Sequence, residues 1–427
     1  MRPRFVLGLI AVLAAGLFLM PAVSAAPAAA GPGDRVKLAC PAQAGGDHPC
    51  RAVYYWGGDG RRHAFPNAAT YFSWYADFSG IKTVDAGALA ALTLGANVTY
   101  RPGSRLLKLA TDPRVYAVDA GGVLRGLASE AAARAVFGSG WGRLIDDLPD
   151  VFAADYRYGA AVNTAADFDA DARLAAAPTI DADAGAIYDD RQVATASGSF
   201  RVRLVTLDRS RYQLKTLVAA AADCADQCAA EPLLDYAQGA GAGIAIHGTY
   251  FCPPDYADCA GKTYSFLWPV WDSSRSEMRN ADDIKYHEAP IVAAYADGRL
   301  AYYPRANAYA SLPAFLAAYG SPLTAAVANY PGLVDGGQVI VESEPRLEDS
   351  QRTVKGRRGA FGFSADKFFL AVAENATVVD LAWIMKSLGA DYALNLDGGG
   401  SAALVYGGVY KVGPGRLLPN ALVFVRK

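Results

Sequence analysis

The sequence has no excess of basic residues. Its 427 residues carry 40 Lys and Arg against 42 Asp and Glu, which gives a formal net charge of −2. Proteins that bind nucleic acid through bulk electrostatics normally show a basic excess or a basic stripe. That class is therefore disfavoured, and no nucleic-acid partner is expected. Any anion that this protein recognises has to be met by a few local groups.

Long apolar runs are also missing after the N-terminus. Arg2 and Arg4 precede an apolar run over residues 5–20, and small residues follow at 23–25, which is the pattern of a cleavable secretory signal. The run falls just short of the length that spans a bilayer, so an uncleaved anchor is the alternative to a signal peptide over residues 1–25. No Cys follows the run, which disfavours a lipoprotein. We expect a secreted or cell-surface protein with no transmembrane segment after cleavage.

Cysteine is scarce, and its residues fall in close couples: Cys40 with Cys50, Cys224 with Cys228, and Cys252 with Cys259. An even count in an exported chain favours disulfides. We expect pairing within each couple, with crossing between the last two couples as one alternative. A metal site built from the last four cysteines is another, although their spacing misses the common zinc patterns. The Asp-rich loops show no ordered spacing for Ca²⁺, so neither a cofactor nor a metal is predicted.

The mature chain is too long for a single core, and two domains are expected. After an Ala/Pro/Gly linker at 26–35, residues 36–160 contain an internal repeat with an offset of 62 residues. Each copy consists of a hairpin, a capping residue (Asn67 or Ser129) and a helix. We predict that the two copies form one small pseudo-repeat α+β domain.

The first of these helices carries an aromatic stripe made of Tyr71, Trp74, Tyr75 and Phe78. Helical spacing favours a role in the core, with a glycan platform as the alternative. The region 53–158 resembles a module that recurs near the N-termini of exported bacterial surface proteins. This resemblance implies a location more than a chemistry.

A stretch of Ala, Asp and Pro with little periodicity, residues 161–192, is predicted to be a linker. The second domain then covers residues 193–427. Alternating runs at 200–206 and 212–218 predict strands, and 233–239 predicts a short helix. The predicted fold class is α+β overall, and its C-terminal domain is expected to be α/β, with a mixed sheet and helices packed on it.

The segment Asn-Leu-Asp-Gly-Gly-Gly-Ser at 395–401 follows a predicted buried strand. Before that strand, a capping box at Thr377 begins an apolar-faced helix that Gly389 closes. Successive glycines let a substrate approach the backbone and leave N–H groups free to point at an anion, although an ordinary Gly-rich turn is the alternative. Asp397 is therefore a candidate catalytic residue. The candidate substrate-binding residues here are Asn395, Gly398, Gly399, Gly400 and Ser401.

Three further features contribute candidates. His247 ends a buried apolar run and suits acid/base chemistry, with a satisfied structural His as the alternative; Thr249 follows it as a substrate-binding candidate. Trp268 and Trp271 could stack on a sugar ring or pack their loop on a sheet. Of the adjacent Arg357 and Arg358, at most one can face a site. Arg358 is the catalytic candidate because its guanidinium matches phosphate oxygens, and a solvated surface is the alternative.

Residues from about 200 to 427 resemble the phosphodiester glycosidase family. The matching pieces are Ile-x-Gly-Thr-Tyr-Phe at 246–251, Arg-x-Ala-x-Gly at 358–362, the helix after it, and 395–401. The family's animal member removes N-acetylglucosamine from the phosphodiester cover of mannose 6-phosphate. The resemblance implies an exported hydrolase that releases a sugar from a sugar-1-phosphodiester, and bacterial members are linked to exopolysaccharide or cell-wall glycans. The family usually has Asn where His247 stands, so a changed substrate, a changed pH optimum or a loss of activity are open outcomes.

These observations assign roles. Arg358 and the N–H groups of residues 398–400 would hold the phosphate, and Asp397 would support positive charge on the sugar either electrostatically or as a nucleophile. His247 would transfer a proton or position the substrate. The expected partners are a glycan or glycosyl-phosphodiester substrate and the cell wall. A non-catalytic glycan-binding envelope protein is the rival hypothesis. A hydrolase of ordinary glycosidic bonds is the third, with Asp272 or Asp335 as its second carboxylate.

Overall fold

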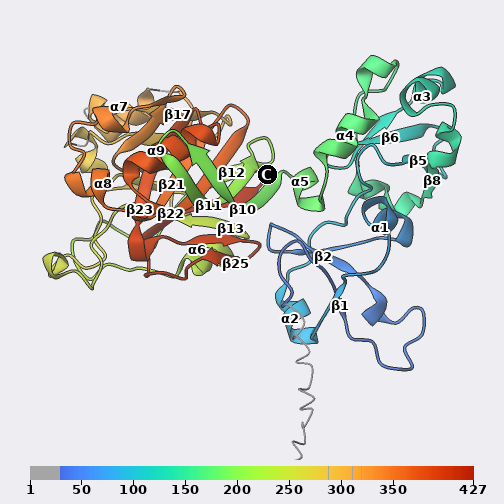
Figure 1. Ribbon diagram of the computed structural model, residues 1–427, viewed down its shortest axis with the longest axis horizontal. Helices are drawn as coiled ribbons and strands as arrows, with labels where there is room; N and C mark the ends of the chain where they lie inside the picture. Colours follow the sequence, from blue (N-terminus) through green and yellow to red (C-terminus); the bar gives the residue numbers. More distant parts are fainter. Residues whose placement is uncertain (1–28, 287, 310, 319) are drawn as a thin grey trace, which may run out of the picture.

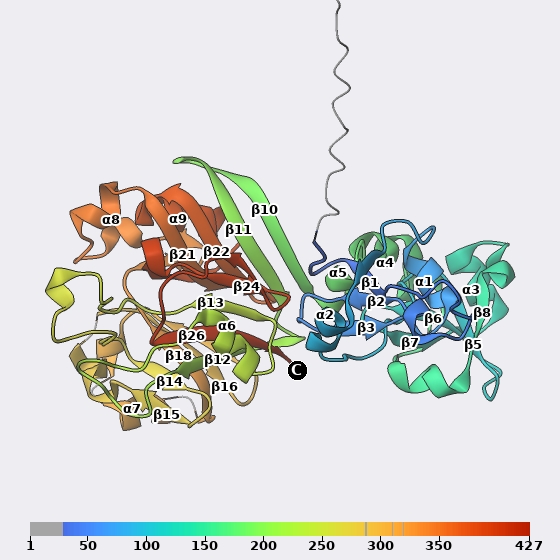
Figure 2. The same cartoon turned by 90° about the horizontal axis from the view of Figure 1, so that it is seen from below.

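The computed structural model describes residues 29–427 apart from 287, 310 and 319. The signal peptide expected at 1–25 lies outside the described residues, as does the beginning of the linker at 26–35. The fold is α+β, with both mixed and antiparallel sheets. Figures 1 and 2 show the N-terminal elements gathered on one side and the C-terminal elements on the other, with the short helix α5 (Ile180–Ala184) at their junction.

The two copies of the N-terminal repeat have the same strand order. The first sheet, in the order β3-β2-β1-β4, consists of β1 (Arg35–Leu38), β2 (Tyr54–Trp56), β3 (Arg62–Ala64) and β4 (Lys82–Val84). The second, in the order β8-β5-β6-β7-β9, consists of β5 (Leu106–Leu109), β6 (Val115–Asp119), β7 (Val123–Gly126), β8 (Ile145–Leu148) and β9 (Arg157–Tyr158). In both, the first strand pairs antiparallel with the hairpin and parallel with the strand after the helix.

Capping side chains begin the repeat helices, as the sequence predicts. Asn67 accepts a hydrogen bond from the backbone of α1 (Ala68–Trp74), and Ser129 does the same for α3 (Glu130–Phe137). The other helices of this half are α2 (Ala86–Ala91) and α4 (Ala170–Ala176). Tyr71 on α1 is only 1% exposed and its ring stacks on that of Phe78, so this aromatic belongs to the core. We call residues 35–158 the N-terminal module.

The C-terminal half contains three sheets. The first, in the order β10-β11-β22-β21-β23-β19-β20, has the strands β10 (Ala186–Thr195), β11 (Gly198–Asp208), β19 (Gly332–Asp335), β20 (Gln338–Val339), β21 (Gly356–Phe363), β22 (Lys367–Ala376) and β23 (Tyr392–Gly398). The second, the central sheet, has β12 (Tyr212–Val218), β26 (Asn420–Arg426), β13 (Ile244–His247), β24 (Leu404–Tyr406) and β25 (Val409–Val412), in that order. The third has β15 (Glu277–Arg279), β14 (Val270–Asp272), β18 (Leu323–Ala328), β16 (Ile291–Tyr295) and β17 (Leu300–Tyr303).

Two features of this half differ from the sequence prediction. The described pairings in its three sheets are antiparallel, whereas we predicted a mixed sheet. Parallel neighbours require crossover connections, and here hairpins and long loops join most strands instead. In addition, β10 begins at Ala186, inside the predicted linker 161–192, and this linker also contains α4 and α5.

Alternating side chains build the layers. Leu370 and Val372 of β22 point into a core shared with the central and third sheets, while Phe369 and Ala371 point to the opposite face. That opposite face is covered by α9 (Val378–Ser387), whose Thr377 capping box forms as predicted. The remaining helices are α6 (Leu233–Gly239), which covers the outer face of the central sheet, α7 (Leu312–Ala317) and α8 (Asp349–Thr353).

Glycines join the N-terminal module to the central sheet. The backbone N–H of Gly407 donates to the carbonyl oxygen of Gly58, at 3.1 Å. A Cβ atom at Gly58 would lie 2.2 Å from the Tyr406 hydroxyl, and one at Gly243 would lie 2.3 Å from the carbonyl carbon of Asp59. Side chains cannot be accommodated at such distances, so the Gly58 backbone packs on the Tyr406 hydroxyl and the Gly243 backbone packs on that of Asp59.

Candidate functional site

Strand pairing brings the catalytic candidates together at one end of the C-terminal sheets. Arg358 of β21 lies opposite Gly398 of β23. The backbone N–H of Asp397 donates to the carbonyl oxygen of Gly248, 3.1 Å away, just after β13. His247, Arg358 and Asp397 therefore meet although up to 150 residues separate them in the chain. We call this end of the fold the Asp397 site.

Asp397 is a buried carboxylate with incomplete compensation. Burial raises the pKa of its side chain to about 6, against the opposing effects of hydrogen bonds from Ser401 and Gly398 and of the charges of Arg416 and Arg358. The Gly398 N–H lies 2.8 Å from Oδ1. The carboxylate is consequently ionised at neutral pH but close enough to titration to respond to a bound charge.

Two arginines lie against the glycine turn that follows Asp397. A Cβ atom at Gly398 would lie 3.4 Å from Nη1 of Arg358, and one at Gly400 would lie 3.1 Å from Cζ of Arg416. The absence of side chains at these glycines lets both guanidinium groups lie against the turn. Gly399 between them has a φ of +58°, in the left-handed region that favours glycine. We call the pair Arg358 and Arg416, which lies against the turn that follows Asp397, the arginine clamp.

The hydrogen bonds and the ion pair of the two arginines fix their positions and use only some of their N–H donors. Arg358 donates from Nη2 to the carbonyl oxygen of Val354 at 2.7 Å and from Nε to that of Ala376 at 3.3 Å. Arg416 donates to the Ser401 hydroxyl at 3.3 Å and forms an ion pair with Asp255 at 2.5 Å. Sequence reasoning missed Arg416 because it follows the β24–β25 hairpin, in a turn with no recognisable motif.

His247 lies in the site but is tied to the backbone. Its side chain is 0% exposed, Nε2 lies 2.7 Å from the Asp397 carbonyl oxygen, and Nδ1 lies 3.2 Å from the Ala403 nitrogen and 3.0 Å from the Ala403 oxygen. A neutral ring with its proton on Nε2 donates to Asp397 and accepts from the Ala403 N–H. Burial lowers the pKa of His247, which favours this uncharged form. The geometry therefore supports positioning of the Asp397 backbone and gives no support for proton transfer.

The ring of His247 fits because residue 359 is glycine. A Cβ atom at Gly359 would lie 2.2 Å from Cε1 and Nε2 of His247. This contact explains how the chain accommodates an imidazole at a position where the resembling family usually has the smaller Asn.

Asn395 and Tyr250 form a buried polar pair near Asp397. Asn395 is 1% exposed and donates from Nδ2 to the Tyr250 hydroxyl at 2.7 Å, while its Oδ1 has no hydrogen-bond partner among the described residues. Gln351 also donates to the Tyr250 hydroxyl, at 3.3 Å. Two donors occupy the lone pairs of this oxygen, so its own proton is free to be donated. Sequence reasoning did not single out Tyr250, although it stands in the Gly-Thr-Tyr-Phe run.

Thr249 has a structural environment. Its backbone N–H donates to Oδ1 of the buried Asn420 at 3.0 Å, and its hydroxyl accepts from Nδ2 of the same side chain at 2.9 Å. The hydroxyl in turn donates to the Tyr250 carbonyl oxygen at 3.2 Å. These contacts fix the loop after β13, on which Tyr250 lies.

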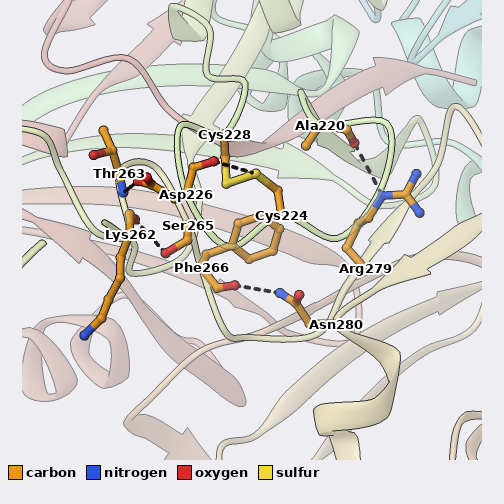
Figure 3. Close-up of a disulfide and its surroundings, with 10 residues drawn as sticks. All are labelled: Ala220, Cys224, Asp226, Cys228, Lys262, Thr263, Ser265, Phe266, Arg279 and Asn280. Carbon is orange, nitrogen blue, oxygen red and sulfur yellow. Dashed lines mark hydrogen bonds between the residues drawn. A yellow bond between two sulfur atoms is a disulfide. The ribbon is translucent and has the colours of Figure 1, made fainter. Parts of the chain in front are cut away.

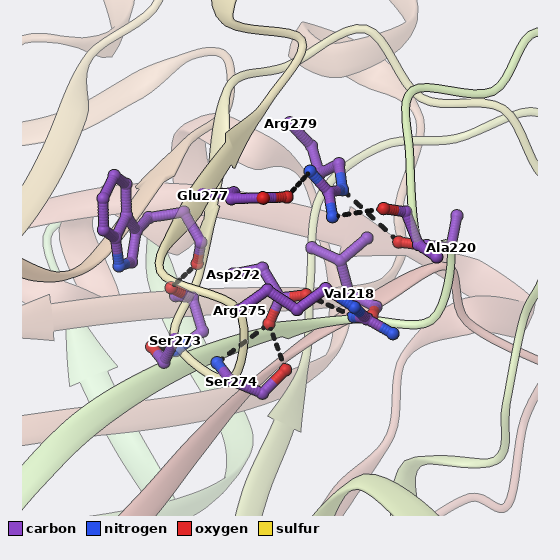
Figure 4. Close-up of polar contacts among 11 residues, drawn as sticks. Val218, Ala220, Asp272, Ser273, Ser274, Arg275, Glu277 and Arg279 are labelled. Carbon is purple, nitrogen blue, oxygen red and sulfur yellow. Dashed lines mark hydrogen bonds and ion pairs between the residues drawn. The ribbon is translucent and has the colours of Figure 1, made fainter.

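The tryptophans and the additional carboxylates lie elsewhere. Trp271 is 9% exposed and belongs to the core of the third sheet, and Trp268 packs against that core. Asp272 is fully buried and bound by Ser274 and Arg275 (Figure 4). Asp335 lies at the β19–β20 turn. The contacts of Asp272 and Asp335 provide no second carboxylate beside Asp397.

The predicted local cysteine pairs are confirmed: Cys40–Cys50, Cys224–Cys228 and Cys252–Cys259 form disulfides. Figure 3 shows the Cys224–Cys228 loop, where the Asp226 carboxylate accepts from the Thr263 N–H at 2.7 Å and so ties this loop to the one that contains Cys252–Cys259. The alternative of a cysteine metal site is therefore wrong.

Residues 280–425 match the phosphodiester glycosidase family. This match agrees with the family that the sequence resemblance predicts. Arg358, Arg416 and residues 395–401 lie within the matched range, whereas His247 and Tyr250 precede it. No curated protein matches the chain.

Solved structures show distant likeness. A protein of Synechocystis is 16% identical with a TM-score of 0.39, and the match covers 57% of this chain and 62% of that one, less than two thirds of its length. The catalytic domain of zebrafish N-acetylglucosamine-1-phosphodiester alpha-N-acetylglucosaminidase, auto-inhibited by its pro-peptide, is 15% identical with a TM-score of 0.44 over 56% and 82% of the two chains. A Burkholderia pseudomallei protein designated as exported is 14% identical with a TM-score of 0.32 over 54% and 75%.

Among the described residues, no helix combines the length and apolar character that crossing a membrane requires.

Proposed function

We propose that this protein is an extracytoplasmic hydrolase that releases a sugar from a glycosyl-1-phosphodiester in a cell-envelope or exopolysaccharide glycan. The observation that carries the proposal is the arginine clamp, whose two guanidinium groups lie against the glycine turn and close enough to Asp397 for their charges to act on its carboxylate. Guanidinium groups and a bare glycine backbone recognise phosphate, and a carboxylate supports a sugar cation.

Cleavage of a glycosyl phosphodiester separates charge, with positive charge at the anomeric carbon and negative charge on the departing phosphate. In our proposal Arg358 and Arg416 bind the phosphate together with N–H groups of residues 398–400, so they stabilise the charge that develops as the bond breaks. Asp397, ionised above about pH 6, stabilises the sugar cation.

The Tyr250 hydroxyl is the proton donor that we assign to the site. It accepts hydrogen bonds from Asn395 and Gln351, so its proton points away from both. Because a phosphate monoester is a good leaving group, a hydrogen bond from Tyr250 is sufficient and full proton transfer is not required. His247 positions Asp397 through the hydrogen bond to its carbonyl oxygen.

The extracytoplasmic location is supported by two observations. The chain forms three disulfides, which persist in oxidising compartments. The N-terminal sequence also has the pattern of a secretory signal.

The test is hydrolysis of the methyl phosphodiester of N-acetylglucosamine 1-phosphate. We expect Arg358→Ala and Asp397→Asn each to lower kcat/KM by about 10³-fold or more, because each substitution removes a group that stabilises charge in the transition state. Arg357→Ala is the matched control, because Arg357 pairs with Glu374 instead. Full turnover by either site variant contradicts the proposal. Binding of purified cell walls without turnover by the unmodified protein supports the glycan-binding rival instead.

A further inference from the structure

A cavity of about 600 Å³ lies between the N-terminal module and the central sheet. Its walls come from the β2–β3 hairpin, from residues 95–99, from α5 and from the adjoining ends of β12 and β26. Ligand sites in proteins occupy about 300–1,000 Å³ and occur preferentially at domain interfaces. The cavity therefore has the size and the position of a binding site.

This cavity and the Asp397 site lie at opposite ends of the same strands. Asn420 begins β26 beside Thr249, and Arg426 ends β26 at the cavity. At about 3.3 Å per residue, these ends lie roughly 20 Å apart. The two sites are thus distinct, but an extended polymer could contact both.

The acidic side chains of the wall already have partners. Asp181 accepts from the Gly58 N–H at 2.8 Å and from the Tyr406 hydroxyl at 2.9 Å. Asp183 accepts from the Gly121 N–H at 2.7 Å, and Asp155 accepts from Asn97 at 3.0 Å. Asp59 pairs with His63 at 2.9 Å. Asp181 therefore links the hairpin of the module to Tyr406 of the central sheet, whereas Asp59 and Asp155 pair within the module.

The basic side chains of the same wall are not used in this way. Among the residues that the structure describes, the side chains of Arg61, Lys215 and Arg426 form no hydrogen bond or ion pair. Arg426 lies close enough to Asp59 and His63 for its charge to act on both. The wall carries four carboxylates against Arg61, Lys215, Arg426 and Lys427, so its formal charges nearly balance. The three cations without a partner are the groups available to the anionic part of a ligand.

Aromatic side chains complete the wall. Tyr55, Trp74 and Tyr212 line the cavity. Tyr55 and Tyr212 are only 2% exposed, whereas Trp74 is half-buried and is fixed by a hydrogen bond from its indole N–H to the Thr99 carbonyl oxygen at 2.8 Å. Aromatic faces suit the apolar faces of sugar rings, and Arg and Lys suit phosphate.

We propose that the cavity between the N-terminal module and the central sheet is a second binding site, for a phosphate-bearing sugar unit of the glycan. The choice of phosphate over other anions rests on the proposed function, whereas the cavity, the free cations and the aromatic wall do not. A unit held there would keep a polymeric substrate attached while a bond about 20 Å away, along β26, is cleaved.

The experiment compares a polymer with a single unit. The double variant Arg61→Gln/Lys215→Gln removes two cavity cations, and Lys108→Gln/Arg143→Gln removes two exposed cations of the module that do not line the cavity. The substrates are poly(N-acetylglucosamine 1-phosphate) and the methyl phosphodiester of N-acetylglucosamine 1-phosphate. Equilibrium binding of the polymer is measured in the Asp397→Asn background, so that turnover does not interfere.

We expect the cavity variant to raise KM for the polymer about tenfold or more at unchanged kcat, to weaken polymer binding by the same factor, and to leave the single-unit substrate unaffected. The charge-matched control should behave as the parent protein does. Equal polymer binding by the cavity variant and the control overturns the inference, even if hydrolysis is intact. Polymer binding that depends on Arg61 and Lys215 without any hydrolysis upholds the inference and overturns the proposed function.

Discussion

A buried histidine lies at each end of the central sheet, His247 on β13 and His63 on β3 of the module. The two side chains differ in their partners and in the direction of their pKa shifts. His247, at the Asp397 site, contacts backbone groups and is held uncharged by burial. His63, at the module joint, faces two acceptors, with Nδ1 2.8 Å from the Ala96 oxygen and Nε2 2.9 Å from the Asp59 carboxylate. Burial lowers the pKa of His63, but the hydrogen bond to Asp59 and its charge outweigh this and raise the pKa overall.

The carboxylates at the two ends are alike in one respect. At the joint, burial raises the pKa of Asp181 and of Asp183, although both accept hydrogen bonds. At the Asp397 site, burial exceeds what Ser401, Gly398 and the arginines return, and the carboxylate keeps a raised pKa. An incompletely compensated charge is typical of functional sites. Asp397 is set apart by the glycine turn and the two arginines beside it, so a raised carboxylate pKa marks a functional site in this protein only together with such geometry.

The largest expected effect on stability sharpens the comparison at His247. His247→Ala should destabilise the protein by about 2–4 kcal/mol, because the Asp397 carbonyl and the Ala403 N–H lose their buried partner. His247→Asn should retain most of this stability and turnover within about tenfold, since an amide can still donate. Denaturant unfolding measures the first effect. A kcat/KM profile whose pH midpoints move in His247→Asn contradicts a positioning role.

A second prediction concerns Asp397 itself. Its folded pKa of about 6 lies above the unfolded value, so ionisation costs stability, progressively from about pH 4 and fully above about pH 6. Asp397→Asn should therefore be inactive yet more stable at pH 8, by about 1–3 kcal/mol. This gain should vanish near pH 4. Thermal unfolding at both pH values provides the measurement, with Asp335→Asn as the control; an equal Tm for Asp397→Asn and the parent at pH 8 contradicts the prediction.

The smallest effect is expected at the joint. His63 has a raised pKa and Asp59 a lowered one, so the pair stabilises the fold while His63 is protonated and Asp59 ionised. This contribution, about 1 kcal/mol, is lost as the pH rises from about 6.5 through the raised pKa of His63. The stability difference between the parent and His63→Gln should therefore shrink from pH 6 to pH 9. If the stability difference between the parent and His63→Gln does not vary with pH, the prediction is contradicted, because His63 and Asp59 then form no charged pair.

Local signals in the sequence predict local structure well. The capping box at Thr377 gives α9, the short helix at 233–239 forms with the expected bounds, and the cysteines pair within their couples. Each of these features depends on residues that lie within about one helical turn or one loop of each other. Their relative positions are therefore set by the local backbone and not by distant strand pairing.

Features that depend on distant pairing were not predictable in the same way. Sheet direction in the C-terminal half depends on which strands meet, and the expectation of a mixed sheet failed there. Arg416 reaches Gly400 only because the β24–β25 hairpin returns the chain to the glycine turn. The cavity combines the module with strand ends more than 300 residues away. The resemblance of the module to surface proteins stays a prediction.

The glycine joint limits which substitutions the contact between the two halves can accept. A Cβ atom at Gly58 or Gly243 would come within 2.3 Å of the other half. Even alanine at either position would therefore clash, and the two halves would have to move apart. An engineer who wants to exchange the module has to transplant its hairpin tip together with the turn that receives it.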